Sequence, residues 1–338
     1  MSSPSAVEGA AGTRTLTFAQ AVNEALAEEM RRDETVFIIG EDVAEAGTPF
    51  KVLAGLVEEF GPERVLDSPI SEPGITGLGV GAAMTGLRPV VDIMFGDFLT
   101  LVMDQLANQA AKAHYMSGGK LRVPLTLRTT LGATRRSAAQ HSQSLQAWVA
   151  HVPGLKVVLP SSPADAKGLL KTAIRDNNPV VFIEDKMDYT VKGEVPDGEF
   201  LIPFGVADVK RVGGDVTIVA TSSMVRVALA AAEQLEREGI SAEVIDPRTI
   251  SPLDEDTIVR SAEKTGRAIV VDEGHQRYGV TAEIAAVIAD RAFYSLDAPV
   301  KRMGALDVPV PFSPTLEDVT VPTPETVARV ARQLCGKD

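Results

Sequence analysis

Glu72 has the side-chain type and the local setting of a catalytic acid or base. It stands between Pro69 and Pro73, shortly after an apolar run at 65–66. If that run is a strand, Glu72 lies in a stiff loop at its carboxyl end, where open α/β sheets bind their ligands. A carboxyl group there can hold or transfer a proton. The same residue also fits a structural role, because an acidic side chain at a helix start interacts favourably with the helix dipole.

His141 is a second candidate for acid–base chemistry. It lies in the polar segment 139–143 and has the least apolar surroundings of the four histidines. An imidazole in such surroundings can transfer a proton or donate a hydrogen bond to a developing oxyanion. A histidine that caps a surface helix would have the same local sequence, so this alternative stays open. Arg135 and Arg136 precede it, and their positive charges either meet a carboxylate or are solvated.

Apolar side chains accompany Glu72 near the expected strand ends. Phe95 and Phe98 follow the apolar run 90–93, and Ile70 lies two residues before Glu72. An aromatic side chain at this position belongs to the core unless a flat ligand lies beside it. If such a ligand binds here, Ile70 can supply an apolar wall.

Several common catalytic motifs do not occur in the chain. There is no G-x-S-x-G, no H-E-x-x-H and no G-x-x-x-x-G-K-[ST] sequence, which argues against the usual hydrolases and nucleoside triphosphatases. Residues 77–82 match the relaxed dinucleotide fingerprint G-x-G-x-x-A, so a nicotinamide-dependent oxidoreductase stays an alternative. However, residues 68–73 separate these glycines from the preceding strand. In a helix, Gly77 and Gly81 would instead form a flat side that another backbone can approach closely.

The elements that would position these side chains alternate between helix and buried strand. Thr17 and Gln20 have the spacing of a capping box, and an apolar face recurs every four residues after them. Such alternation predicts right-handed crossovers onto mostly parallel sheets, the α/β class with doubly wound domains. The expected strands of the first half are 36–39, 65–66, 90–93, 124–127, 156–159 and 180–184, with helices at 53–60, from 75, at 99–112, after 143 and at 163–175.

The length of 338 residues predicts two domains. Between 185 and 214 the chain is rich in Gly and Pro and shows no helical period, and the alternation of strand and helix then starts again. We therefore expect a disordered tail at 1–14, an α/β domain at 15–190, a linker at 191–214 and a second α/β domain at 215–338.

Composition excludes several classes of partner and location. The 33 basic and 46 acidic residues give a net charge of −13 without a basic run, so a nucleic acid partner is not expected. The single cysteine, Cys335, rules out a disulfide framework and a multi-cysteine zinc site, and it favours a reducing cytoplasm. No apolar stretch is long enough to span a bilayer, and residues 1–13 lack a targeting pattern.

Many short segments, in order along the chain, together carry a resemblance to one family. They are 68–74, 77–81, 94–98, 104–105, 115–119, 139–143, 153–156, 175–179, 246–254 and 269–273. The family that they resemble is the β subunit of the thiamine-diphosphate-dependent 2-oxo acid dehydrogenase first component, which is related to transketolase. The resemblance implies a transketolase-like pyrimidine-binding domain at 15–190 and a transketolase C-terminal domain at 215–338. Segments 160–163, 175–178 and 193–196 are similar to the acetoin-type members, and pyruvate-type members share most of the rest.

The resemblance implies a role for each candidate side chain. Glu72 matches the glutamate that bonds the 1′ nitrogen of the aminopyrimidine, a step in which a carboxyl group shares a proton with a weakly basic nitrogen. Phe98, Ile70 and Met94 match residues of the cofactor pocket. His141 matches a histidine near the reacting centre. A structural monovalent-cation site, with K⁺ as the expected ion, is also implied at Leu125, Ala173, Ile174, Asp176 and Asn178.

One family motif is missing from this chain. Thiamine-diphosphate enzymes bind the diphosphate through Mg²⁺ on a Gly-Asp-Gly sequence, and none occurs here. The resemblance therefore implies that an α subunit supplies the metal and the diphosphate half of the site, in an α₂β₂ heterotetramer. The implied activity is a pyruvate or acetoin dehydrogenase that forms an acyl-cofactor intermediate and transfers the acyl group to lipoamide of an acyltransferase component. A branched-chain 2-oxo acid substrate and a purely structural subunit stay alternatives.

Overall fold

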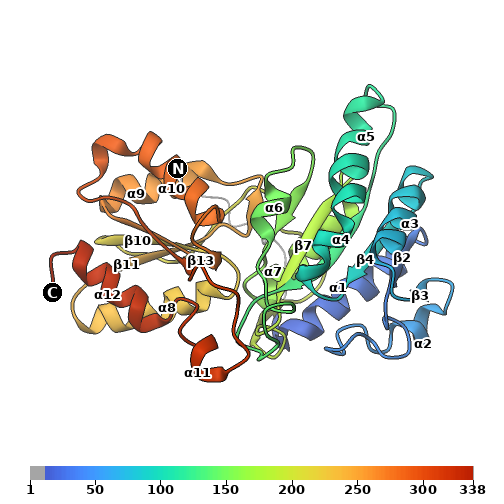
Figure 1. Ribbon diagram of the computed structural model, residues 1–338, viewed down its shortest axis with the longest axis horizontal. Coiled ribbons are helices and arrows are strands. Elements are labelled where there is room, and N and C mark those ends of the chain that lie inside the picture. Colours follow the sequence, from blue (N-terminus) through green and yellow to red (C-terminus); the bar gives the residue numbers. More distant parts are fainter. Residues whose placement is uncertain (1–11, 338) are drawn as a thin grey trace. The chain divides into compact units, whose positions relative to one another are not determined.

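The computed structural model describes residues 12–337 (Figure 1). Most of the tail expected at 1–14 therefore lies outside the described residues, whereas Thr13 and Arg14 belong to a strand, β1 (Thr13–Thr17). The described chain forms two compact units. Unit 1 contains the residues up to Thr130 and then Trp148–Phe204, and unit 2 contains Leu131–Ala147 and the residues from Gly205 onward.

Unit 1 is built on a parallel sheet with the strand order β6-β7-β5-β4-β2-β3. The capping box expected at the first helix is present, since Thr17 and Gln20 each accept a hydrogen bond from the other's backbone N–H. The elements are α1 (Phe18–Arg32), β2 (Val36–Gly40), α2 (Leu56–Phe60), β3 (Val65–Asp67), α3 (Glu72–Met84), β4 (Arg88–Ile93), η1 (Gly96–Phe98), α4 (Leu99–Met103), η2 (Asp104–Ala110), α5 (Ala111–Met116), β5 (Thr126–Leu131), α6 (Gln146–Ala150), β6 (Lys156–Val158), α7 (Pro163–Arg175), β7 (Val180–Asp185) and β8 (Lys192–Pro196).

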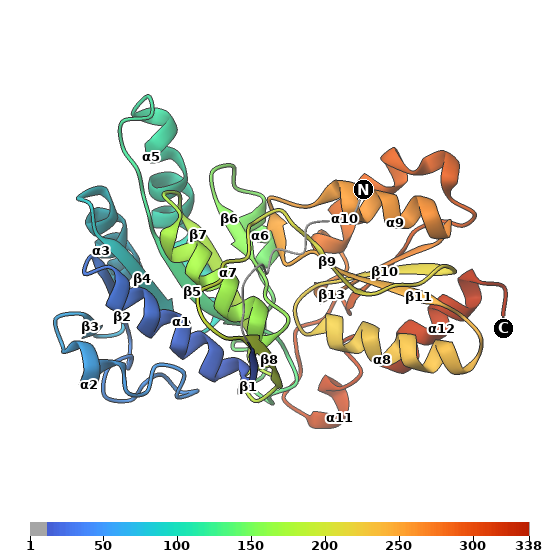
Figure 2. The same cartoon turned by 180° about the vertical axis from the view of Figure 1, so that it is seen from behind.

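Successive strand residues of unit 1 point to opposite faces of its sheet and pack on different helices. Val90 belongs to a buried cluster with Phe18 of α1 and Leu170 of α7, and these two helices lie side by side in Figure 2. Val91 faces α3, because a Cβ on Gly79 of that helix would lie 2.4 Å from its Cγ2 atom. Helices therefore cover both faces, as a doubly wound sheet requires.

The direction of the crossovers in unit 1 reverses between β2 and β4. Both β3 and β4 pair with β2 in parallel, so the chain passes from one side of β2 to the other through α3. In open α/β sheets, ligands bind outside the carboxyl ends of the strands at such a reversal. Glu41, Glu72 and Met94 all follow carboxyl ends of strands at this edge.

Unit 2 has the same architecture on a smaller sheet, with the order β14-β13-β10-β11-β9. Ile218 packs in a cluster with α8 and α12, whereas Val219 packs with α9 and α10. Only β9 runs antiparallel to its neighbour. The elements are β9 (Asp208–Arg211), β10 (Val216–Ala220), α8 (Met224–Arg237), β11 (Ala242–Asp246), β12 (Thr249–Ser251), α9 (Glu255–Thr265), β13 (Ala268–His275), α10 (Val280–Arg291), η3 (Phe293–Ser295), β14 (Lys301–Ala305), α11 (Pro314–Glu317) and α12 (Pro324–Leu334).

The structure corrects two expected helices. The helix expected at 53–60 begins only at Leu56, because Gly55 before it has a left-handed backbone with φ of 86°. The helix expected at 99–112 is divided into α4, the π-helical segment η2 and α5.

The segment 191–214 is not the linker that its Gly and Pro content suggested. Strand β8 pairs antiparallel with β1, Phe200 and Ile202 lie in the core of unit 1, and β9 joins the sheet of unit 2. The boundary falls between Phe204 and Gly205. Local sequence could not reveal this, because the partners of these residues are far away in the chain.

None of the helices that the structure describes combines the length and the apolar character needed to cross a bilayer.

Replacing Ile202 with alanine tests whether the segment after β8 belongs to the core. The side chain is only 7% exposed, so we expect Ile202→Ala to lower the free energy of unfolding by about 2–5 kcal/mol. Val212 lies in the same segment but is 77% exposed, and Val212→Ala is the control. Urea unfolding of both variants gives the comparison, and equal midpoints would mean that 191–204 is a linker after all.

Candidate functional site

Glu72 is the first residue of α3, with Ser71 as the N-cap. Its side chain is 8% exposed, and no hydrogen bond or ion pair joins its carboxylate to another residue of the described chain. A carboxylate at this helix end interacts favourably with the helix dipole. Its oxygens nevertheless keep their capacity to bind a donor, so the position at the helix start leaves the chemical role open as a prediction.

A second carboxylate lies beside Glu72 at the end of the neighbouring strand. Burial raises the pKa of the Glu41 carboxyl above its ordinary value, and the negative charges of Asp42 and Glu72 add to this effect. Glu41 directly follows β2. This edge of the sheet is therefore acidic, and it would favour a ligand that donates a proton or hydrogen bond.

Apolar side chains are also present near this edge. Ile70 is 72% exposed, whereas Met94 and Phe98 are half-buried. The ring of Phe98 packs edge-on against Phe95, with centroids 6.0 Å apart. Phe95 thus supports the ring of Phe98, whereas the residues that the structure describes leave the apolar side chain of Ile70 exposed.

An aromatic row extends from Phe98 into the core of unit 1. Phe95 packs edge-on against Phe50, with ring centroids 6.0 Å apart. The centroids of the Phe50 and Tyr189 rings are 5.1 Å apart. The ammonium group of Lys186 lies 5.3 Å from the centre of the Phe95 ring. These contacts restrict the position of Phe95, and through it the position of Phe98.

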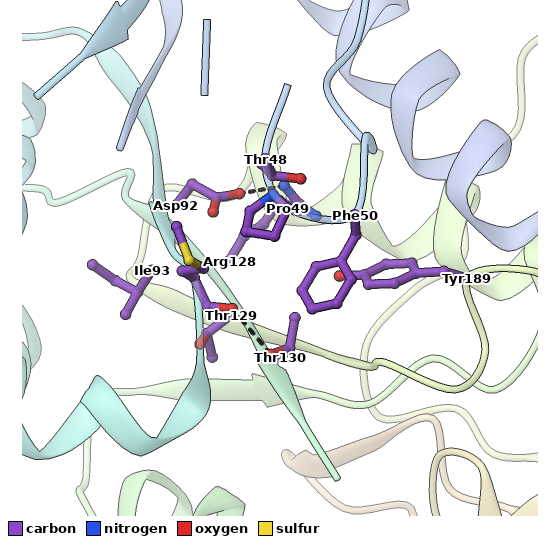
Figure 3. Close-up of a pocket in the computed structure, with 10 residues that line it drawn as sticks. Thr48, Pro49, Phe50, Asp92, Ile93, Arg128, Thr129, Thr130 and Tyr189 are labelled. Carbon is purple, nitrogen blue, oxygen red and sulfur yellow. Dashed lines mark hydrogen bonds and ion pairs between the residues drawn. The ribbon is translucent and has the colours of Figure 1, made fainter. Parts of the chain in front are cut away.

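Three buried charged residues, Asp92, Arg128 and Glu184, are joined in the sheet of unit 1, and Figure 3 shows the first two of them. Arg128 donates to Glu184 at 2.6 and 2.8 Å and to Asp92 at 2.5 Å. The strands that carry them, β4, β5 and β7, are neighbours in the sheet. Burial raises the pKa of Asp92 to about 6, since the opposing effect of Arg128 is partly cancelled by the charge of Glu184.

A small hollow of about 10 Å³ lies beside this triad, lined by residues such as Thr48, Phe50 and Thr129. This is about the space of one water molecule. The Thr130 hydroxyl donates to the Met94 carbonyl at 3.1 Å, so the backbone after β4 is fixed from β5. Figure 3 shows the rings of Phe50 and Tyr189 next to each other on one side of the hollow.

The sequence reasoning did not select these supporting residues. Asp92, Arg128 and Glu184 each lie within a strand whose other residues are buried. A charged residue inside such a strand must be paired, and this signal could have identified the triad.

His141 belongs to unit 2, in a segment that connects β5 to α6. Three buried carboxylates of unit 2 bind this segment. Gln146 donates to Asp272 at 2.8 Å, the backbone N–H of Ala133 donates to Glu273, and that of Thr134 donates to Glu317 at 2.6 Å.

The backbone of this segment is strained before His141. Thr134, Arg136 and Ala138 have φ values of 70°, 58° and 59°, and Gly132 has 107°. Each left-handed residue other than glycine costs about 1–2 kcal/mol. Such a conformation persists only where surrounding contacts fix it.

The expected alternatives for Arg136 are resolved by its contacts within unit 2. Its guanidinium donates to Glu317 at 2.7 Å and lies 2.7 Å from a carboxylate oxygen of Asp318. These hydrogen bonds raise the pKa of Arg136 above its ordinary value. Arg136 therefore meets carboxylates of its own chain.

The residues expected to bind a monovalent cation lie around one loop between α7 and β7. Arg88 already donates to the carbonyl oxygens of Ile174 and Asp176, at 2.9 and 3.0 Å. Although burial acts in the opposite direction, hydrogen bonds from Lys156 and Asn178 lower the pKa of Asp176.

The other two members of this expected set, Leu125 and Ala173, also use their carbonyl oxygens in backbone hydrogen bonds. The donor set is rich in carbonyl oxygens, which suits a hard cation. However, Arg88 and Lys156 already bring positive charge to it, so the cation stays a prediction. No group of three or more His, Cys, Asp or Glu in the described part of the chain could hold a metal ion.

The glycines of α3 divide into two kinds. Gly79 has no room for a side chain, because it packs on Val91. A Cβ on Gly81 would meet nothing within 4 Å among the described residues, and one on Gly77 only Gln105 at 3.8 Å. The dinucleotide interpretation of 77–82 is wrong, since these glycines lie inside a helix rather than directly after a strand. The flat side expected at Gly77 and Gly81 is open.

Comparison with known families agrees with this architecture. Residues 14–192 match the transketolase pyrimidine-binding domain, and residues 205–327 match the transketolase C-terminal domain. A solved split-gene transketolase, an inactive β4 tetramer, superposes with a TM-score of 0.79 over 95% of this chain and 98% of its own, at 23% identity. The expected pair of transketolase-like α/β domains is confirmed.

Three curated relatives are similar over nearly the full length. The chain is 52% identical to the β subunit of the acetoin:2,6-dichlorophenolindophenol oxidoreductase of Bacillus subtilis, over 96% of this chain and 98% of that protein. It is 48% identical to the mitochondrial pyruvate dehydrogenase E1 component subunit beta-1 of Oryza sativa subsp. japonica, over 96% and 88%. Identity to the 2-oxoisovalerate dehydrogenase subunit beta of Bacillus subtilis is 44%, over 94% and 98%.

Replacing Asp92 with asparagine tests the buried triad through its pH dependence. The folded state holds a proton on Asp92 up to about pH 6, whereas the unfolded chain releases it near the ordinary value of 3.8. Stability is therefore lost as pH rises from about 4 to about 6, by roughly 3 kcal/mol at most. Asparagine does not titrate, so Asp92→Asn removes this loss of stability with rising pH.

Urea unfolding of wild type and Asp92→Asn at several pH values from 4 to 7 provides the measurement. The stability of wild type relative to the variant should fall through the window from 4 to 6. A constant difference across that window would contradict the raised pKa.

Proposed function

Because this chain belongs to the family of β subunits of the thiamine-diphosphate-dependent first component of 2-oxo acid and acetoin dehydrogenases, we propose that it serves acetyl transfer. In this proposal it pairs with an α subunit, cleaves acetoin or pyruvate, and passes the acetyl group to a lipoyl group of an acyltransferase component. The higher identity to the acetoin enzyme, 52% against 48% and 44%, supports acetoin as the preferred substrate. Branched-chain 2-oxo acids are the alternative.

The observation that carries this proposal is the setting of Glu72. Glu72 as a whole residue is only 8% exposed, yet no hydrogen bond or ion pair within the described chain binds its carboxylate. A buried carboxylate is costly unless something pairs with it, and a ring nitrogen of the pyrimidine is such a partner. Ile70, Met94 and Phe98 supply the apolar and aromatic surface that a flat heterocycle needs.

Each of these residues has a defined task in the proposed site. Glu72 holds a proton shared with the pyrimidine 1′ nitrogen, Phe98 orients the ring from the support of Phe95, and Ile70 and Met94 exclude water. When bound, thiamine diphosphate supplies a carbon nucleophile that accepts the electron pair of the substrate's breaking carbon–carbon bond. His141 donates a hydrogen bond to an oxygen of the substrate or to the incoming lipoyl disulfide.

The missing Gly-Asp-Gly sequence fits a divided site. We propose that the α subunit binds Mg²⁺ and the diphosphate, in an α₂β₂ heterotetramer. The open glycine side of α3, at Gly77 and Gly81, gives a partner helix room to approach. The cytoplasmic location expected from the sequence stays a prediction.

A substrate panel tests the proposed function. The chain is purified with its natural α subunit, supplied with thiamine diphosphate and Mg²⁺, and assayed with 2,6-dichlorophenolindophenol as the electron acceptor. We expect acetoin to give the highest kcat/KM, pyruvate a lower one and 2-oxoisovalerate the lowest. The highest value with 2-oxoisovalerate would favour the branched-chain alternative, and activity without thiamine diphosphate would overturn the proposal.

The variant Glu72→Gln tests the proton-sharing role. Glutamine keeps the size and one acceptor oxygen but cannot share a proton as a carboxylate does. We expect turnover to fall by about an order of magnitude or more, with assembly intact by size-exclusion chromatography. Glu58 is an exposed carboxylate of α2, so Glu58→Gln is the matched control. Normal turnover of Glu72→Gln would exclude Glu72 from catalysis.

A further inference from the structure

We propose that the buried carboxylate of Glu317 is a positioning group, which holds the segment before His141 in the shape that makes His141 effective. The inference rests on the role proposed above for His141 in acetyl transfer to the lipoyl group. It adds a residue that is distant in sequence and that would not contact substrate or cofactor itself.

The first argument is the number of donors that Glu317 binds in this one segment. It accepts the backbone N–H of Thr134 at 2.6 Å, the backbone N–H of Arg136 at 3.2 Å and the guanidinium of Arg136 at 2.7 Å. Its side chain is 0% exposed. A buried carboxylate that is hydrogen-bonded in this way is held firmly, and it fixes its donors in turn.

The second argument is the conformation that these bonds impose. The two residues whose N–H groups point at Glu317 are also two of the left-handed residues, with φ of 70° at Thr134 and 58° at Arg136. Alternating left-handed residues turn successive N–H groups toward one anion. Without the anion, extended or right-handed backbone would be favoured, and the path toward His141 would change.

The third argument is the place at which Glu317 binds the segment. Glu273 binds the N–H of Ala133 at its start, and Asp272 binds Gln146 at its end. Between these two points, Glu317 binds the N–H groups of Thr134 and Arg136. Glu317 thus holds the part of the chain that lies between the contacts of Glu273 and Asp272.

Substituting Glu317 with glutamine tests the proposal in the α-containing complex. Glutamine can accept from Thr134 but cannot bind all three donors. We expect acetyl transfer to lipoamide to fall by about tenfold or more, because a small misplacement of a catalytic group has effects of this size. Reduction of 2,6-dichlorophenolindophenol should fall less. Asp318→Asn is the control, since Asp318 contacts the same guanidinium but is 57% exposed.

A double variant separates positioning from a general structural effect. If Glu317 acts through His141, then adding Glu317→Gln to His141→Ala causes little further loss of lipoamide activity. Losses that multiply would overturn the proposal. If His141→Ala itself transfers acetyl groups normally, the proposed role of His141 fails instead.

Amide hydrogen exchange gives a readout that does not depend on activity. Peptides that cover residues 132–141 should exchange faster in Glu317→Gln than in wild type and Asp318→Asn. Unchanged exchange would overturn the proposal whatever the role of His141. If Glu317→Gln does not assemble, Arg136→Met removes the guanidinium arm alone, and we expect a smaller effect in the same direction. No effect of that variant on exchange would also count against the proposal.

Discussion

The guanidinium of Arg128, shared between Asp92 and Glu184, is the interaction on which the edge of the first sheet depends. It joins three neighbouring strands at the level where their carboxyl ends begin. Removing one partner would leave a buried charge unpaired. The free-energy cost of such a charge is much larger than the net stabilisation that the intact ion pair provides. Thr130, on the strand that carries Arg128, donates to the Met94 carbonyl at 3.1 Å, so the backbone after β4 is held by the same strand.

Both units use buried carboxylates at the same place in their topology. In unit 1 the crossover reverses between β2 and β4, and the buried carboxylates near that edge include Glu72 and Asp92. In unit 2 the reversal lies between β10 and β13, where Asp272 and Glu273 bind the segment of His141. In open α/β sheets this edge binds ligands. In unit 2 the segment of the chain that contains His141 binds there instead.

The domain organisation of the chain follows from these contacts rather than from sequence order. The segment 131–147 leaves the end of β5 and is bound by unit 2, although it lies in sequence between two parts of unit 1. Glu72 and His141 therefore stand on different units. Each of the two residues is therefore positioned by the contacts of its own unit.

The sequence by itself determined the α/β class, the capping box at Thr17 and the candidates Glu72 and His141, because these depend on local periodicity, turn residues and side-chain type. The family followed from the order of many short segments. Only the tertiary structure decided that Glu317 binds the residues before His141, that 191–204 is core and that Gly79 packs tightly while Gly81 is open. Local patterns cannot specify such pairings, since the partners are up to 183 residues apart and meet only when whole sheets have formed.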